Sequence, residues 1–353
     1  MNRVLTTLLL ALFTAACGPQ QEVAPDVYAP LPEPPEEVDA EATYQLYCAL
    51  CHGSEGQGYE ADGANALTNP EFLATARDDF IAHAIERGRP GTSMSSWGAP
   101  MGGPLSSAEV VALVTLIRSW ATRDPIALSS KGIPGKAARA EAIYTYQCAS
   151  CHGEEGEGLP FISLNNPEFL ATATDHYIRH AIAKGRSNTP MPGFETQLTE
   201  ESIDDLVALI RSWQTPVGSG PSQLPGKDLG QPVLNPGGPA PEFEADRYVP
   251  VDTVKEQYDA GAEMILLDAR PSPDYATEHI KGAVSVPFYA VAEYLDQLPT
   301  DVTIVCYCAC PHAESSAAAD VLEANGYDQV KVIDEGFLVW RDRGYPTSTG
   351  GFP

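Results

Sequence analysis

The chain has 353 residues, of which 43% are hydrophobic, and a formal net charge of -27. A chain of this length is too long to fold around one small hydrophobic core, which predicts two or three domains. A chain this acidic is unsuited to a phosphate backbone, which argues against nucleic acid as a partner. Partners that are steered by charge are expected to be basic.

The first 17 residues, MNRVLTTLLLALFTAAC, have the layout of an export signal. Arg3 gives a positive start, and the apolar run Val4–Ala16 is too short to span a bilayer. Small residues then precede Cys17, which resembles a bacterial lipoprotein signal. The resemblance implies a periplasmic protein held at a membrane by lipid on Cys17, with cleavage by ordinary signal peptidase as the alternative.

Composition divides the rest of the chain into three modules and two linkers. Stretches rich in Pro with Glu or Gly cannot bury a core and predict extended linkers. The expected domains are a signal peptide (1–17), a Pro/Glu-rich tether (18–38), two related modules (39–124 and 136–215), a Pro/Gly-rich linker (216–246) and a final module (247–350).

Three sequence blocks occur twice in the same order. Helix caps before the last block and apolar residues at 3–4 spacing within it indicate helices, so two small all-α domains are expected. The offset between copies falls from 100 to 97 to 93 residues, which indicates an internal duplication with two loop deletions. The blocks are CALCHGSEGQG and CASCHGEEGEG (from Cys48 and Cys148), NPEFLAT (from Asn69 and Asn166) and LIRSW (from Leu116 and Leu209).

The CxxCH motif in each copy is typical of covalent haem attachment. Two thiols at this spacing can add to both vinyl groups of one haem, and the next imidazole can reach the iron from the same side. Zinc would need a second ligand pair, which neither copy offers. The sequence therefore predicts two covalently bound c-type haems, one on Cys48 and Cys51 with His52 as axial ligand and one on Cys148 and Cys151 with His152.

Residues 40–123 and 138–214 each resemble a small monohaem cytochrome c domain. The match comprises CxxCH near the start, a methionine in a Gly/Pro-rich loop and a closing helix that ends in tryptophan. The resemblance implies electron transfer, with methionine as the sixth iron ligand and no open position for substrate. A thioether favours ferrous iron and raises the haem potential.

The second copy contains one methionine, Met191, whereas the first contains Met94 and Met101. Met94 stands five residues after Arg89, as Met191 stands five after Arg186. This register favours Met94 as the ligand and leaves Met101 as the alternative, in an insertion that the second copy lacks.

Two further pairs of residues recur at equal positions. His83 and His180 are expected on the surface of the middle helix, with a ligand or propionate contact as the alternative. Arg89 and Arg186 follow that helix and are candidates for pairing with haem propionates, because a planar guanidinium matches a carboxylate.

From about residue 247 the pattern changes to alternating strand and helix. Short apolar runs such as MILLDARP and VTIVCYC indicate buried strands. The Ala-rich SSAAADVLEANG indicates a helix that Gly326 ends. The alternation predicts an α/β domain with a central parallel sheet.

Residues 247–347 resemble a rhodanese domain. The resemblance rests on LLDARP, EHIKGAVSVP, a cysteine-bearing loop after TIVCYC, and GFLVWRDRGYP. In that family the loop cysteine takes sulfane sulfur as a persulfide, which backbone N–H groups and the following helix stabilise. The resemblance gives this role to Cys308.

The loop ACPHAESS departs from the family pattern. Glu314 stands near where an arginine is often found, and a carboxylate there opposes an anionic donor such as thiosulfate. Cys310 is a candidate for resolving a persulfide, and His312 for donating a proton. Two alternatives stay open, namely a soft-metal site formed by Cys306, Cys308, Cys310 and His312, and a weakened domain that only binds.

The expected function is periplasmic electron transfer by a dihaem c-type cytochrome, with redox partners in the respiratory chain. A sharper hypothesis couples oxidation of sulfane sulfur or thiols at Cys308 to that chain, with a sulfur donor as a further partner. The rival hypotheses are an electron carrier with a non-catalytic binding domain, and a sulfurtransferase without electron coupling.

Overall fold

The computed structural model describes residues 31–32, 37–58, 64–158, 161–244, 247–309 and 311–353. The predicted signal segment with Cys17 lies outside these ranges, as does Cys310. None of the helices in the described ranges is both long enough and apolar enough to cross a membrane.

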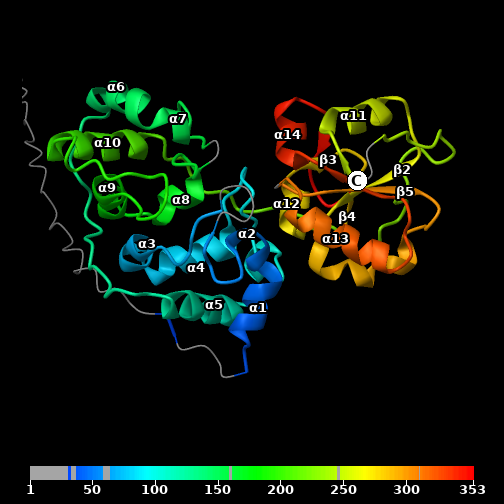
Figure 1. Ribbon diagram of the computed structural model, residues 1–353, viewed down its shortest axis with the longest axis horizontal. Helices are drawn as coiled ribbons and strands as arrows, with labels where there is room; N and C mark the ends of the chain where they lie inside the picture. Colours follow the sequence, from blue (N-terminus) through cyan, green and yellow to red (C-terminus); the bar gives the residue numbers. More distant parts are fainter. Residues whose placement is uncertain (1–30, 33–36, 59–63, 159–160, 245–246, 310) are drawn as a thin grey trace, which may run out of the picture.

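The predicted fold class is confirmed, with two helical modules followed by an α/β domain (Figure 1). Module 1 contains α1 (Ala40–Tyr47), α2 (Ala49–His52), α3 (Pro70–Thr75), α4 (Asp78–Arg87), the 3-10 turn η1 (Ala99–Met101) and α5 (Ser107–Ser119). Module 2 contains α6 (Ala137–Gln147), α7 (Ala149–His152), α8 (Pro167–Thr172), α9 (Asp175–Lys184) and α10 (Glu200–Ser212).

Side-chain caps begin several of these helices. Ser106 and Glu109 form a complete capping box at α5, as the sequence pattern predicts. The short helices α3 and α8, which sequence reasoning did not assign, begin at Asn69 and Asn166, whose side chains accept two backbone N–H groups each. Capping by asparagine followed by proline therefore explains why the NPEFLAT block recurs.

The arginine of each LIRSW block holds its module together. Arg118 in α5 donates to Asp78 at 2.5 Å and to the Leu73 carbonyl at 2.6 Å. Arg211 in α10 repeats both contacts with Asp175 and Leu170. Each guanidinium thereby ties the last helix to the end of one short helix and the start of the next.

The two modules pack against each other through reciprocal contacts. The Asn69 side chain donates to the Ser187 carbonyl at 2.9 Å, and the equivalent Asn166 donates to the Pro90 carbonyl at 3.0 Å. The rings of the equivalent residues Phe80 and Tyr177 lie 5.0 Å apart. The duplicated modules thus form a pseudosymmetric pair.

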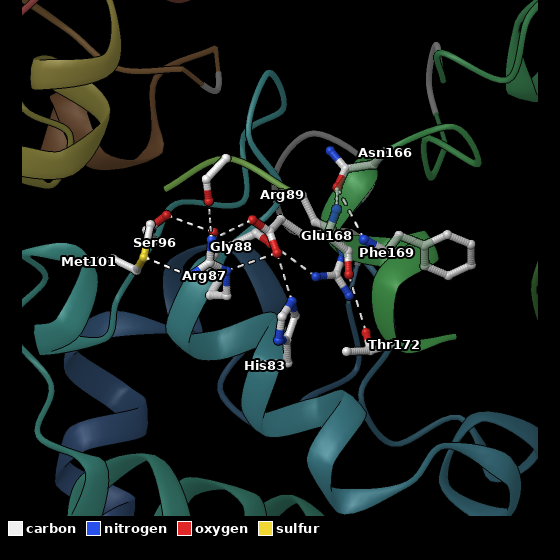
Figure 2. Close-up of polar contacts among 11 residues, drawn as sticks. His83, Arg87, Gly88, Arg89, Ser96, Met101, Asn166, Glu168, Phe169 and Thr172 are labelled. Atoms are coloured by element: carbon white, nitrogen blue, oxygen red, sulfur yellow. Dashed lines mark hydrogen bonds and ion pairs between the residues drawn. The ribbon is translucent and has the colours of Figure 1, made fainter. Parts of the chain in front are cut away.

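A buried ion pair joins the modules at one side of this interface (Figure 2). Glu168 of module 2 accepts from Arg87 at 2.9 Å and contacts Nε2 of His83 at 2.7 Å, both in α4. Burial opposes ionisation of Glu168, but the hydrogen bonds from Arg87 and His83 hold its pKa below the usual value. His83 is therefore an interface residue, not a residue of the free helix surface as the sequence suggested.

Replacing Glu168 by Gln should destabilise the protein by about 3 kcal/mol, because it removes the buried carboxylate that pairs with the part-buried Arg87 and His83. The loss is measured as the difference in the free energy of unfolding between the haem-loaded variant and the haem-loaded wild-type protein. Asp79→Asn is the control, because Asp79 pairs with Arg77 at the exposed surface and should cost less than about 1 kcal/mol. Equal losses in the two variants would contradict the role given to Glu168.

The C-terminal domain contains a parallel sheet of strand order β1-β6-β5-β2-β4. Alternate residues of β2 pack on opposite faces, with Ile265 and Leu267 toward α13 and Met264 and Leu266 toward α11 and α14. The elements are β1 (Tyr248–Val249), α11 (Val251–Asp259), β2 (Met264–Asp268), α12 (Ser272–Thr277), β3 (His279–Ile280), β4 (Val284–Ser285), η2 (Phe288–Glu293), η3 (Leu295–Gln297), β5 (Thr303–Tyr307), α13 (Ala313–Ala324), β6 (Val330–Ile333), α14 (Gly336–Asp342) and β7 (Thr347–Ser348).

The segment expected as a linker, residues 216–246, packs on the C-terminal domain over part of its length. Leu234 pairs with Met264 through backbone hydrogen bonds of 2.8 and 3.3 Å, and Leu229 is buried. Arg87 of module 1 donates to the Gly218 carbonyl at 2.5 Å. Isolated leucines between the prolines and glycines provide enough apolar surface to dock this segment.

Candidate functional site

The CxxCH turn has the same structure in both modules. Tyr44 donates its hydroxyl to the Gly53 carbonyl at 2.8 Å, and Tyr144 makes the same bond to Gly153 at 2.8 Å. The closing tryptophan of each module, Trp120 in module 1, packs edge-on against this tyrosine. The first and last helices thereby fix the turn that presents the cysteines and histidine.

The histidine of each motif is oriented through its Nδ1 atom. His52 Nδ1 lies 2.8 Å from the Asn65 carbonyl, and His152 Nδ1 lies 2.9 Å from the Ile162 carbonyl. A carbonyl only accepts, so Nδ1 carries the proton and Nε2 keeps its lone pair for a metal. Burial lowers the pKa of both imidazoles, which favours the neutral form that binds metal.

One cavity of about 1270 Å³ connects the two motifs. This volume exceeds that of an ordinary pocket for one small molecule. Met94 and Met191 line the cavity, whereas Met101 is buried outside its lining with its sulfur 3.2 Å from Nη1 of Arg87. Of the two methionines in module 1, Met94 therefore shares a cavity with His52. The remaining predicted haem residues that line it are Cys48, Cys51, Cys148, His152 and Cys151.

Two arginines also line the cavity and suit anionic groups. Arg89 lies over the rings of Phe80 and Phe169, and Arg186 lies over Tyr177. Burial lowers the pKa of Arg89 to about 10. Among the described residues no carboxylate lies within ion-pair distance of either guanidinium. Paired thiols, oriented histidines, methionines and part-buried arginines around one large cavity fit two c-type haems with propionates.

Cys308 follows β5 directly and is fully buried. Its Sγ lies 3.3 Å from Ser315 Oγ in the first turn of α13, and its carbonyl accepts from Phe337 N at 2.7 Å. Cys306, two residues earlier, lies inside β5 and packs in the core, where burial raises the pKa of its thiol. The chain thus places Cys308, rather than Cys306, in the loop that leads to α13.

The other side chains of this loop differ in their exposure to solvent. Glu314 is buried at the start of α13. His312 is half-exposed, its ring lies 4.6 Å from the tilted ring of Tyr248, and its Nε2 lies 3.7 Å from Asp334. No group of three His, Cys, Asp or Glu residues suited to a metal occurs among the described residues, which do not include Cys310.

Asp268 and Arg270 of the LLDARP block form a buried ion pair beside this loop. Arg270 donates to both carboxylate oxygens of Asp268, at 2.9 and 2.6 Å, and lies 4.1 Å over the ring of Phe337. Asp268 is paired in register with Tyr307, the last residue of β5. The pair therefore fixes the strand ends from which the Cys308 loop leaves.

The C-terminal domain contacts module 1 through an aromatic cluster. Tyr47 lies 5.2 Å from Tyr289, and Trp97 lies 6.4 Å from both Phe288 and Tyr289. Helix α13 also contacts α2, which carries the haem motif of module 1. The Cys308 loop is thereby held next to the module 1 site, and Ala309, Pro311 and Glu314 line the same cavity as the haem motifs.

Comparison with known families agrees with this architecture. A model of the cytochrome c oxidase, cbb3-type, subunit III family matches residues 36–117 and 135–210. A rhodanese-like domain model matches residues 250–343. The chain contains two cbb3-type cytochrome c domains and belongs, in its C-terminal domain, to the rhodanese-like family.

Curated relatives match parts of this chain. The cbb3-type cytochrome c oxidase subunit FixP of Bradyrhizobium diazoefficiens is 27% identical over 177 residues, covering 47% of this chain and 57% of that protein. Thiosulfate sulfurtransferase GlpE of Pseudomonas fluorescens is 32% identical over 96 residues, covering 27% and 84%. An HTH-type transcriptional regulator of Mycobacterium tuberculosis is 34% identical over 88 residues, covering 25% and 39%. The chain thus spans about half the length of the cbb3-type subunits.

Sequence reasoning missed several residues that position the rhodanese-like domain. Ser95, next to Met94, hydrogen-bonds Asp274 of α12, and burial raises the pKa of that carboxyl to about 6. Tyr289 and Ser315 were equally unmarked by motif. A single aromatic residue or serine belongs to no sequence motif. The one available signal was that module 1 has Tyr47 and Trp97 where module 2 has Gln147 and Phe194, a difference between the copies that indicates a contact made by module 1.

Proposed function

We propose that this dihaem electron carrier accepts electrons from sulfur oxidised at Cys308 of its rhodanese-like domain. The observation that supports this is the single cavity lined by both haem motifs and by the loop that follows Cys308. A rhodanese-like domain with no role in electron transfer would not need a loop that lines the same cavity as the haem motifs. A sulfur site whose neighbouring loop residues Ala309, Pro311 and Glu314 line the haem cavity suits electron exchange between the two.

The charges at the loop favour a neutral sulfur donor. Glu314, Asp334, Glu335 and Asp342 line this end of the cavity, against one cation, Arg341. Acidic side chains repel thiosulfate, which is anionic, and admit hydrogen sulfide or a neutral thiol. Because Cys308 is fully buried, the donor reaches Sγ only when the loop side chains move aside.

The proposed step forms one sulfur–sulfur bond. The Cys308 thiol and the donor thiol R–SH combine to Cys308–S–S–R, both thiol protons leave to solvent, and the two electrons that the sulfur pair loses would go to the two bound haems. With hydrogen sulfide the product is the Cys308 persulfide. Ser315 Oγ, 3.3 Å from Sγ, and the N-terminal turn of α13 stabilise the anionic sulfur.

The chain has residues for accepting the electrons as well as for forming the sulfur–sulfur bond. c-type haems supply one-electron transfer when bound, and two of them match the two electrons of a sulfur–sulfur bond. Cys48, Cys51 and His52 would hold one haem with Met94. Cys148, Cys151, His152 and Met191 would hold the other haem.

We further propose that the protein is exported and is anchored to a membrane by lipid. An exported protein that carries lipid on Cys17 would place this chemistry at a membrane surface, within reach of respiratory redox partners. The resemblance of residues 1–17 to a lipoprotein signal supports it.

The test is anaerobic mixing of the oxidised, haem-loaded protein with hydrogen sulfide, a neutral thiol, a persulfide and thiosulfate. Haem absorbance reports reduction. Neutral donors should reduce the haems at least ~10-fold faster than thiosulfate at low ionic strength, because the acidic loop repels the anion. Equal rates for neutral and anionic donors, or no reduction by any donor, would argue against the proposal.

A further inference from the structure

The surface around the CxxCH turn is an interface in module 1. Tyr47 packs at 5.2 Å on Tyr289 of the rhodanese-like domain, and α2 contacts α13. One copy of the duplicated module therefore shows that this surface can bind another domain.

The same surface of module 2 is exposed and carries different side chains. Gln147 stands where module 1 has Tyr47, and Tyr146, in place of Leu46, is 85% exposed. Gln147 lines the haem cavity beside Cys148. This surface thus adjoins the second haem site without the aromatic pair that binds the rhodanese-like domain.

Module 2 has also gained negative charge at this surface. Glu154 and Glu157 stand where module 1 has Ser54 and Gln57. The Glu157 carboxylate accepts from the Glu155 backbone N–H at 2.7 Å, as the Gln57 amide oxygen accepts from Glu55 at 2.9 Å. The turn is therefore the same in both copies, and the carboxylates change the charge rather than the structure.

We propose that this module 2 face, formed by Tyr146, Gln147, Glu154, Glu155 and Glu157, docks a redox protein with a positively charged surface. The carboxylates would steer a basic partner, and the exposed tyrosine would anchor it beside the haem cavity. Module 1 then holds the rhodanese-like domain on this face, and module 2 exchanges electrons with the partner. The inference rests on the electron-carrier function and not on the sulfur chemistry.

The experiment uses protein reduced with dithionite, freed of excess reductant and mixed anaerobically with a basic, oxidised cytochrome c. The E154S/E157Q variant gives module 2 the side chains of module 1. At low ionic strength its second-order rate constant should fall ~10-fold relative to wild type, with a flatter dependence on salt. Each rate is divided by the rate with benzoquinone, a small neutral oxidant that needs no docking surface and is not steered by charge, so that damage to a haem site is corrected for.

The matched controls are Glu155→Gln and Glu55→Gln, the same change at the same position of the two copies. Glu155→Gln should lower the ratio of the two rates, and Glu55→Gln should leave it within a factor of about two. Equal effects at Glu55 and Glu155, or a ratio in E154S/E157Q equal to that of wild type, would overturn the assignment. Because dithionite supplies the electrons, a failure of the sulfur chemistry would not change this outcome.

Discussion

Replacing Cys308 by Ala should slow haem reduction by hydrogen sulfide or a neutral thiol at least ~100-fold under anaerobic conditions. The change removes the sulfur that forms the new bond, so two electrons would have to leave a donor thiol with no partner sulfur in the cavity. A loss of this size corresponds to removal of a covalent nucleophile rather than of a binding contact. Rapid-mixing absorbance of the oxidised, haem-loaded protein provides the rate.

The matched control is Cys306→Ala, the same substitution two residues earlier. Cys306 is fully buried inside β5 and packs in the core, so its loss removes apolar volume but leaves the loop in place. Its rate should remain within a few-fold of wild type. A Cys308→Ala protein that is reduced as fast as the Cys306→Ala protein would leave the rhodanese-like domain with a binding role only.

Replacing Met191 or Met94 by Ala should lower the reduction potential of one haem in each case, on the order of 100 mV within the ~0.8 V range that axial ligands set. The thioether stabilises ferrous iron, and its removal also opens the sixth coordination position. The optical spectrum should change to that of a mixture of low-spin and high-spin iron. An anaerobic redox titration of the holoprotein measures both changes.

Met101→Ala is the control for the assignment in module 1. Met101 is buried beside Arg87 and lies outside the cavity lining, so its loss should reduce stability by roughly 2–5 kcal/mol and leave both potentials unchanged. A shifted potential in Met101→Ala with an unchanged one in Met94→Ala would reverse the ligand assignment.

The parts of the fold that local sequence determines were predictable. The capping box at Ser106, the glycine that ends each middle helix and the alternation of strand and helix after residue 247 all depend on residues close in the chain. The haem motifs were also predictable, because Cys, Cys and His act together at fixed spacing.

The arrangement of the domains was not predictable, because it depends on contacts far apart in the chain. Glu168 meets Arg87 across 81 residues, and Tyr47 meets Tyr289 across the whole of module 2. In a sequence, a single charged or aromatic residue of this kind cannot be distinguished from an ordinary surface residue, so its distant partner is not predictable. The docking of Leu234 on Met264 was hidden for the same reason, since the surrounding prolines and glycines indicate a linker.

The duplication also explains how two similar sites acquire different neighbours. Tyr47 and Trp97 provide aromatic surface in module 1, whereas Gln147 and Phe194 occupy these positions in module 2. Only module 1 therefore matches Phe288 and Tyr289 of the rhodanese-like domain. The Cys308 loop lies next to the haem motif of module 1, and no domain in the described residues covers the equivalent face of module 2.

The most direct test of the account counts sulfur and electrons in one sample. The oxidised, haem-loaded wild-type protein receives one equivalent of a neutral thiol without oxygen, and the reaction is quenched. Mass spectrometry then measures the mixed disulfide at Cys308, and absorbance measures reduced haem. One modified Cys308 is expected for every two haems reduced. Reduced haems with unmodified Cys308, or modified Cys308 with oxidised haems, would contradict it.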